Sequence, residues 1–303
     1  MTQCVDSFGV LCLMKTLRRF CFAVAFALIA STPALADPAL WVAKSATATV
    51  YLFGTVHVLP EGSKWHYQAL DKALADSDTL YMEEDDDDPV GMQMLVLQYG
   101  MDLQHPLSKQ LSDADRARLD AAAKAIALPG GAATLDTMKP WLAALTVTVA
   151  PIVKAGYDPK SGADKQLQRT FEASGKKVDA FETAEQQIEY FANLPSALQL
   201  DLLRNVLDDY AKGPEQIEAL VHAWQAGDVD AIAKNVNGSM REQYPDLYKV
   251  LLVDRNRSFA RRIETLLKGD DTIFVAIGAG HLAGPDSVQM QLAKLGIDTE
   301  RVH

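Results

Sequence analysis

Two short stretches of this sequence decide its fold: YLFGTVH at residues 51–57 and FVAIGAGH at residues 274–281. Each is an apolar run of about one strand's length that leads directly into Gly-x-x-His, ending on His57 or His281. In parallel sheets, ligands bind at the carboxyl ends of the strands, and glycine at such an end allows a sharp turn. We therefore expect two parallel strands of one sheet that bring both imidazoles to one point.

Further strands and a helix can be placed around these two stretches. The predicted strands cover residues 40–43, 49–53, 79–82, 176–181, 272–277 and 298–302, and a helix is predicted near residues 64–75. The first two strands read as an N-terminal hairpin. Strand, helix and strand at this spacing are typical of a βαβ unit with a parallel pair.

Helical patterns fill the intervals between the predicted strands. Residues 141–153 carry no charge and are too few to span a bilayer, so they predict a buried core helix. Two capping boxes, Thr183 with Gln186 and Ser196 with Gln199, predict helix starts within a helical insertion. The predicted fold is α/β: a central, mostly parallel sheet covered by helices, with this insertion and the hairpin.

The first 36 residues have the features of a bacterial signal peptide. Three basic residues precede an apolar run at residues 20–30, and Ala-Leu-Ala follows at residues 34–36. The alternative is a short buried helix at the start of the domain. We expect residues 1–36 to be removed and residues 37–303 to form a single domain in the periplasm or outside the cell. All three cysteines lie before residue 37, so the processed chain would hold no disulfide and no thiolate metal ligand.

The charge balance argues against two classes of partner. The whole chain has a net charge of −11. Removal of residues 1–36 takes away three basic groups and one acidic group, leaving 26 basic and 39 acidic groups. Such a chain repels nucleic acid and anionic lipid, so we expect no nucleic-acid partner. No segment after residue 36 predicts a membrane span.

Four candidate side chains follow predicted strands. His57 and His281 end the two Gly-x-x-His stretches, and Glu83 and Glu182 end two other strands. Two histidines with one or two carboxylates suit a divalent metal that accepts nitrogen and oxygen ligands, and a carboxylate beside such an ion is a hydrolytic arrangement. The alternative from spacing alone is that each histidine is a satisfied polar residue at a strand end.

The sequence also resembles the TraB/PrgY/GumN family, which includes the Tiki-type metalloproteases and is distantly similar to haem-binding ChaN and erythromycin esterase proteins. The resemblance covers nearly the whole chain after residue 36. Ala163 and Phe181 depart from the residues usual in the family, and neither departure removes a polar site residue. The resemblance rests on Leu40-Trp41, residues 51–57, Asp78, Glu83, Asp85, Lys139-Pro140-Trp141, Gly162-Ala163-Asp164, Phe181-Glu182-Thr183, Arg255-Asn256 and residues 278–284.

The resemblance implies a site with His57, Glu83 and His281 at its core. It further implies that Glu182 and Asp164 are neighbouring acids and that Arg255 is an anion or oxyanion partner. A divalent ion such as Mn²⁺, Co²⁺ or Zn²⁺ would be the cofactor.

The expected function is that of an exported metal-dependent hydrolase, acting on a peptide or on another amide or ester bond. One alternative is a non-catalytic protein that binds haem or a peptide through the same histidines. Another is an assembly factor that has lost activity. The acidic run at residues 83–88 is expected to be a solvated loop beyond Glu83.

Overall fold

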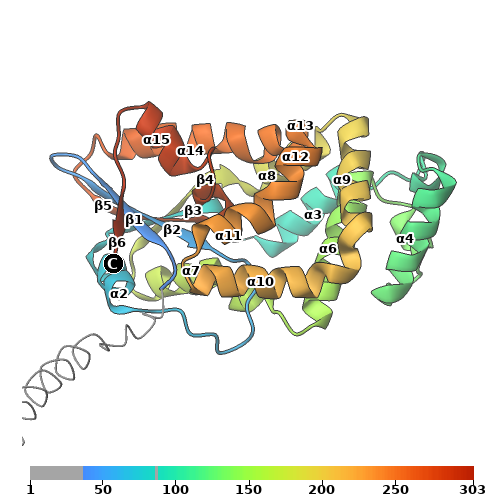
Figure 1. Cartoon of the computed structure of the whole chain (residues 1–303), viewed down its shortest axis with the longest axis horizontal. Helices are drawn as coiled ribbons and strands as arrows, with labels where there is room; N and C mark the ends of the chain where they lie inside the picture. Colours follow the sequence, from blue (N-terminus) through green and yellow to red (C-terminus); the bar gives the residue numbers. More distant parts are fainter. Residues whose placement is uncertain (1–36, 86–87) are drawn as a thin grey trace, which may run out of the picture. The chain divides into compact units, whose positions relative to one another are not determined.

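Six strands of the computed structural model, which describes residues 37–85 and 88–303, form one mixed sheet in the order β4-β3-β5-β2-β1-β6 (Figure 1). The four strands β4, β3, β5 and β2 run parallel to one another, and β1 is antiparallel to both β2 and β6. The predicted hairpin is therefore present as β1 and β2, and the predicted signal peptide lies outside the described residues. The strands are β1 (Leu40–Lys44), β2 (Thr49–Thr55), β3 (Thr79–Asp85), β4 (Lys177–Thr183), β5 (Thr272–Gly278) and β6 (Glu300–Val302).

Successive side chains of β5 point to opposite faces of the sheet, and both faces are covered. Every residue of β5 after Thr272 is buried, as expected for a strand with helices on both sides. Phe274 and Ala276 belong to one hydrophobic cluster, whereas Val275 and Ile277 belong to another. The sheet therefore lies between two cores.

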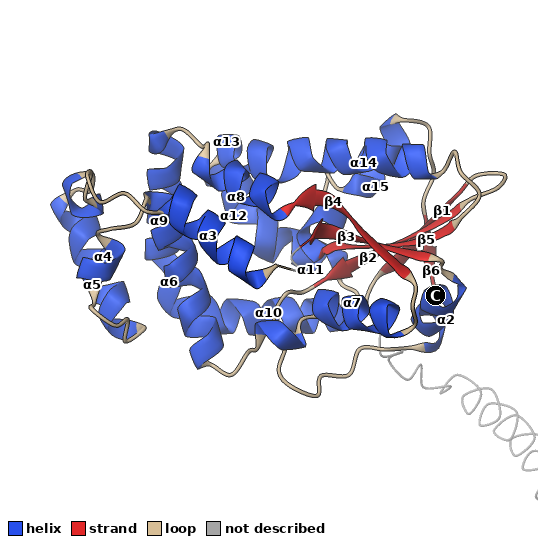
Figure 2. Cartoon of the chain, turned by 180° about the vertical axis from the view of Figure 1, so that it is seen from behind, coloured by secondary structure: helices blue, strands red, loops and turns tan. Residues whose placement is uncertain are grey.

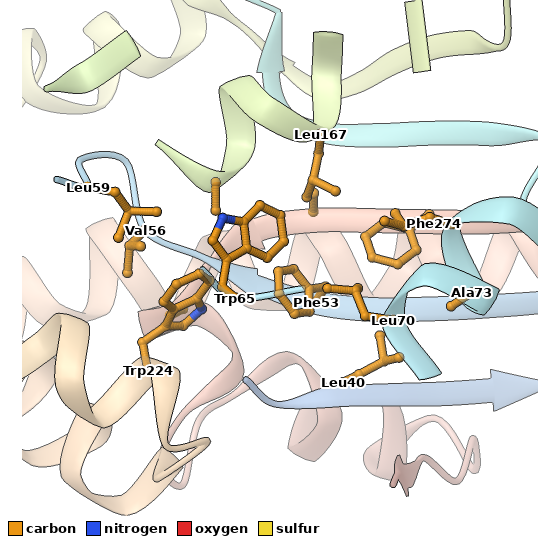
Figure 3. Close-up of a cluster of buried hydrophobic side chains, with 14 of the residues drawn as sticks. Leu40, Phe53, Val56, Leu59, Trp65, Leu70, Ala73, Leu167, Trp224 and Phe274 are labelled. Carbon is orange, nitrogen blue, oxygen red and sulfur yellow. The ribbon is translucent and has the colours of Figure 1, made fainter. Parts of the chain in front are cut away.

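Helices cover the two faces of the sheet in two groups (Figure 2). One face packs against α2 (Gln68–Asp76), α7 (Ala163–Ala173), α10 (Gly213–Gln225) and α11 (Val229–Ile232). Figure 3 shows this core, in which Phe53 lies beside Trp65, with a ring-centroid distance of 5.7 Å. The other face packs against α14 (Asp254–Leu266) and α15 (Val288–Lys294).

Apart from η6 (Ala279–Leu282), which follows β5, the remaining helices lie in two insertions, one between β3 and β4 and one between β4 and β5. Four of them, α4, α5, α6 and α9, share a separate hydrophobic cluster away from the strands. The sequence predicted only the second insertion as such. The remaining helices are α3 (Pro89–Gly100), α4 (Asp113–Ala125), α5 (Ala132–Leu135), α6 (Pro140–Lys154), α8 (Ala184–Ala192), α9 (Ser196–Asp209), α12 (Gly238–Gln243) and α13 (Pro245–Tyr248), with short 3₁₀ segments η1 (Leu107–Lys109), η2 (Pro159–Ser161), η3 (Tyr210–Lys212) and η6 (Ala279–Leu282) and π-helical segments η4 (Ala233–Asn237) and η5 (Lys249–Val253).

The structure tests three predictions about helices: two capping boxes and one buried helix. The capping box at Thr183 and Gln186 is present at the start of α8. The box predicted at Ser196 is wrong, because Pro195 is the N-cap of α9 and Gln199 donates instead to the carbonyls of Ala192 and Leu194. Helix α6 covers the predicted uncharged segment but is buried along one face only, since residues 149 and 153 are each 46% exposed.

The acidic run starts inside the sheet rather than in a loop. Strand β3 extends to Asp85, and Glu84 is paired in register with Glu182 of β4. At the other end of the run, Asp88 is the N-cap of α3 and accepts a hydrogen bond from the Gly91 N–H. Residues 86 and 87 lie outside the described part. Among the described residues, no helix is long and apolar enough to cross a membrane.

Candidate functional site

The two Gly-x-x-His motifs leave the sheet side by side. Strands β2 and β5 are parallel neighbours with Thr55 opposite Gly278. Neither Gly54 nor Gly278 has a positive φ, so neither position needs glycine for a left-handed conformation, and Gly54 lies within β2 itself. A Cβ on Gly54 would instead lie 3.0 Å from the Ala279 Cα, and the Gly54 carbonyl accepts a 2.6 Å hydrogen bond from the buried Trp224 indole. Glycine is required because the two motifs approach each other closely.

Three of the predicted site residues surround Gly278. A Cβ on Gly278 would lie 3.1 Å from Glu83 Oε2, 3.5 Å from His57 Nε2 and 3.6 Å from His281 Cδ2. Glu83 Oε2 accepts a 2.8 Å hydrogen bond from the Gly278 N–H. The other oxygen of Glu83, Oε1, lies 3.7 Å from His281 Nε2. The structure therefore brings His57, Glu83 and His281 together at the carboxyl ends of three neighbouring parallel strands.

Asp164 holds the His57 ring. His57 Nδ1 donates to Asp164 Oδ2 at 2.9 Å. The start of α7 brings Asp164 to this position, because the Ala163 N–H donates to the Val56 carbonyl at 2.9 Å. A Cβ on Gly162 would lie 2.5 Å from the His57 carbonyl oxygen, so the family-like Gly-Ala-Asp stretch lets α7 dock directly on the first motif.

The surroundings of His57 favour its charged form in the metal-free protein. Burial by itself would lower the pKa of the ring. The hydrogen bond and charge of Asp164, with smaller contributions from Glu83 and Glu84, outweigh that effect and raise the pKa to about 9. Water screens part of these charges, since 62% of the His57 side chain is accessible. The contact with Asp164 therefore favours the charged form of the imidazole when no ion is bound.

Arg255 lies between two buried glutamates. Its Nε and Nη2 donate to the two oxygens of Glu182 at 3.0 and 2.6 Å, and Nη2 also donates to Glu83 Oε1 at 2.6 Å. The guanidinium carbon lies 5.2 Å from the centre of the Tyr190 ring and 5.5 Å from that of Phe259. The structure thus brings Arg255 and Glu182 together with Glu83, and the anions that Arg255 contacts belong to the protein itself.

Glu83 is held as an anion by these contacts. Burial would raise its pKa, but the charge and hydrogen bond of His281 and the charge of Arg255 outweigh burial and hold the pKa of Glu83 well below its usual range. The Gln187 amide also donates to Glu83 Oε1, at 3.1 Å. Such a carboxylate remains ionised across the neutral pH range.

Helix α14 also holds the second histidine. His281 Nδ1 lies 2.5 Å from Asn256 Oδ1, and the fully buried Asn256 donates from Nδ2 to the Asp286 carbonyl at 2.8 Å. The ring of Phe259 packs edge-on against His281, with a centroid distance of 5.3 Å. Position, plane and contacts of the second imidazole are therefore set largely by one helix.

Sequence reasoning missed several residues that shape the site. Asn237, at the end of the π-helical η4, donates to the carbonyls of Gly280 and Ala283 and so pins the turn that carries His281. Gln187 and Tyr190, both from α8, contact the Glu83–Arg255 group. No sequence signal marks these three, because each is an ordinary polar residue in a helix far along the chain from its partners.

A cavity of about 330 Å³ opens beside the site. His57, Glu83 and Asp164 contribute its polar side, and Tyr190 and Phe191 of α8 contribute aromatic surface. His281 and Glu182 are buried and are not among its lining residues. The full lining is Thr55, His57, Met82, Glu83, Glu84, Asp164, Lys165, Gln187, Tyr190, Phe191, Arg255 and Ala276.

A family model for the TraB/PrgY/gumN family matches residues 39–301. The chain belongs to this family. The match spans β1 to β6 and includes both Gly-x-x-His motifs, Asp164 and the Arg255-Asn256 pair. Neither the curated proteins nor the solved structures include a match to the chain.

The donor chemistry of this TraB/PrgY/gumN site fits a divalent ion. Each imidazole has its Nδ1 edge against a protein acceptor, an arrangement common for metal-ligating histidines. Across the part of the chain that the structure describes, however, no three His, Cys, Asp or Glu side chains form a metal-binding group. Glu83 is engaged by Arg255 and by the Gly278 N–H instead. His57 and His281 are therefore the residues that would hold an ion, with Glu83 beside them.

Proposed function

We propose that this protein is a metal-dependent hydrolase that acts on a peptide or on another amide or ester bond. The observation that supports this most is the grouping of His57 Nε2, His281 and Glu83 around Gly278, at the strand ends where α/β proteins bind ligands. A cavity of about 330 Å³ adjoins this group, within the roughly 300–1,000 Å³ of small-molecule sites.

Each side chain has a distinct task in this proposal. Asp164 accepts a hydrogen bond from the His57 Nδ1–H and leaves Nε2 of that ring beside Gly278, which Glu83 also adjoins. Arg255 holds Glu83 in place, and His281 and Arg255 together favour its ionised form. A divalent ion, when bound, would act as a Lewis acid that polarises the scissile carbonyl. Both oxygens of Glu83 already accept hydrogen bonds, from Arg255, Gln187 and the Gly278 N–H, so Glu83 suits the role of a charged partner of the ion better than that of a general base.

The role proposed for Arg255 differs from the one that the family resemblance implied. Two aromatic rings lie within 5.5 Å of its guanidinium carbon, and its Nε and Nη2 already donate to Glu182 and Glu83. We propose that Arg255 fixes these two carboxylates and is not a donor to a substrate oxyanion. Glu182 then acts through Arg255 and has no contact with substrate.

The test is cleavage of a peptide library by the purified protein with added Mn²⁺, Co²⁺ or Zn²⁺, compared with a chelated sample. Both Glu83→Gln and His281→Ala should abolish turnover, and His281→Ala should also reduce the amount of metal retained. His222→Ala is the matched control, because His222 is an exposed helix residue whose side chain is 73% accessible. Cleavage that persists at full rate in the chelated sample would contradict the proposal.

A second candidate is a non-catalytic protein that captures haem or a peptide. The absence of a three-residue metal-binding group among the described residues favours it. This candidate predicts tight binding of haem or peptide by the folded wild type, with no metal-dependent cleavage in the library.

We also propose that the protein is exported and that its mature chain begins at Asp37. The order of basic residues, apolar run and Ala-Leu-Ala at residues 34–36 supports this. N-terminal sequencing of the soluble protein from its native host tests it. A soluble protein that retained residues 20–30 would contradict export through signal cleavage.

A further inference from the structure

The orientation of the Asn256 side chain can be assigned from its two partners. Nδ2 lies 2.8 Å from the Asp286 carbonyl oxygen, which can only accept a hydrogen bond. The amide nitrogen must therefore face Asp286, and the amide oxygen must face the His281 ring. Because Asn256 is fully buried, water offers no other partner that would favour the flipped amide.

This orientation determines which nitrogen of His281 carries a proton. Asn256 Oδ1 can only accept, and it lies 2.5 Å from His281 Nδ1. The ring therefore bears a proton on Nδ1 in its charged and in its neutral form alike, and Nε2, 3.7 Å from Glu83 Oε1, is the nitrogen at which an ion would replace a proton. We infer that Asn256 is a positioning residue that fixes the Nδ1–H tautomer of His281 and so makes Nε2 available to a ligand. This inference rests on the proposed function for the identity of that ligand, a divalent ion.

The two histidines are therefore held by different acceptors. His57 is bound at Nδ1 by the carboxylate of Asp164, whereas His281 is bound at Nδ1 by a neutral amide. The difference fits their surroundings, since the His281 side chain is 7% accessible and the His57 side chain is 62% accessible. A carboxylate in place of Asn256 would add a negative charge close to the already ionised Glu83 in a buried region, which is costly. An amide supplies the same acceptor without that charge.

Helix α14 links this positioning role to the rest of the site. Arg255, Asn256 and Phe259 are buried residues of one helix, and they contact Glu83 or His281. Phe259 restricts the plane of the His281 ring. Asn256 fixes the direction of Nδ1 within that plane through the hydrogen bond. One face of α14 thereby sets both the carboxylate and the buried imidazole.

The experiment is nitrogen NMR of the metal-free full-length mature protein labelled with ¹⁵N-histidine, at a pH where the His281 ring is neutral. The His281 signals are assigned by their loss in His281→Gln. Wild type and Asn256→Asp, which both keep an acceptor oxygen, should show His281 protonated on Nδ1. Asn256→Leu should lose this preference and bind added Zn²⁺ about 10–100-fold more weakly, the range found when partners of metal-ligating histidines are removed.

Asn237→Ala is the matched control. Asn237 is also a buried asparagine that contacts the His281 turn, but it bonds backbone carbonyls and not the ring. This variant should lower the unfolding temperature while leaving the His281 tautomer unchanged. A purely structural role for Asn256 would give the same result as Asn237→Ala.

Two outcomes would overturn the inference. One is a neutral wild-type His281 that is protonated on Nε2 and not on Nδ1. This measurement requires no variant to fold. The other is an unchanged tautomer in folded Asn256→Leu. If the tautomer shifts as expected but no form of the protein binds Zn²⁺, the inference about Asn256 holds and the proposed function fails.

Discussion

Replacing Arg255 with methionine would leave the buried carboxylates of Glu83 and Glu182 without the cation that lies between them. The guanidinium has a side-chain accessibility of 10%, and those of the two glutamates are 11% and 5%. Removing one partner from a buried ion pair typically costs about 3–5 kcal/mol, because the remaining charge stays desolvated and uncompensated. For a chain of this size, that corresponds to a fall in unfolding temperature of roughly 6–20 °C.

The matched control is Arg257→Met on the same helix. Arg257 pairs with Asp254 at 3.1 Å, but its side chain is 51% accessible. Exposed pairs contribute about 0–1 kcal/mol, so this variant should unfold near the wild-type temperature. Both variants should be compared with wild type by chemical and thermal unfolding in the presence of a chelator.

The pH dependence of the stability loss in Arg255→Met provides a second test of this prediction. The pKa of Glu83 is lowered in the folded wild type, so its contribution to stability is fully present above the unfolded pKa of about 4.3 and is lost as the pH falls through the folded value. Without Arg255, only His281 and His57 would oppose the effect of burial, so the pKa of Glu83 should rise from its wild-type value, and protonation would relieve the uncompensated charge. The stability difference between Arg255→Met and wild type should therefore shrink as the pH falls from 7.5 toward 5. A deficit no larger than that of Arg257→Met, or one independent of pH, would refute the reasoning.

Three further predictions follow from named contacts. Asp164→Asn should lower the pKa of His57 from about 9 toward its usual 6.5, because the ring loses its main negative partner; NMR titration of the metal-free protein checks this, and an unchanged pKa would contradict it. Gly278→Ala should abolish turnover, since the added methyl would lie 3.1 Å from Glu83 Oε2, whereas Gly238→Ala, with open space at that position, should leave it unchanged; equal activity of both variants in a peptidase assay would count against the crowded site. Changing residues 86–88 together to asparagine should keep activity within a few-fold, since asparagine is as good a helix N-cap as the aspartate that now caps α3; a loss as large as that of His281→Ala would show that the acidic run belongs to the site.

The sequence was sufficient to predict the sheet and the meeting of the two motifs. Strands such as β5 are continuous apolar runs, and the carboxyl ends of parallel neighbours must lie together. The reason for the motif glycines could not be predicted, because it depends on contacts between Gly54 and Ala279, far apart in the sequence. The N-cap of α9 was also missed, since Pro195 occupies that position and Ser196 is the first residue of the helix.

The side-chain contacts around α14 could not be predicted from the sequence pattern for a different reason. Arg255 contacts Glu83 and Glu182, which lie 172 and 73 positions away, and such pairings leave no local signal. The π-helical η5 ends directly before α14, and its wider turn changes which side chains face the sheet. A 3.6-residue periodicity cannot anticipate that change. The family resemblance pointed to Arg255-Asn256, but only the structure relates Arg255 to the two glutamates and Asn256 to His281.

The proposed hydrolysis depends on an ion held at His57 and His281. The most direct measurement is the rate of peptide hydrolysis by the mature protein as a function of the amount of metal bound per chain, from the chelated to the saturated state. The proposed function predicts a rate that rises in proportion to occupancy, starts from zero and is absent in His57→Ala and His281→Ala. A rate that does not change with occupancy, or saturated protein that cleaves no peptide in the library, would contradict it.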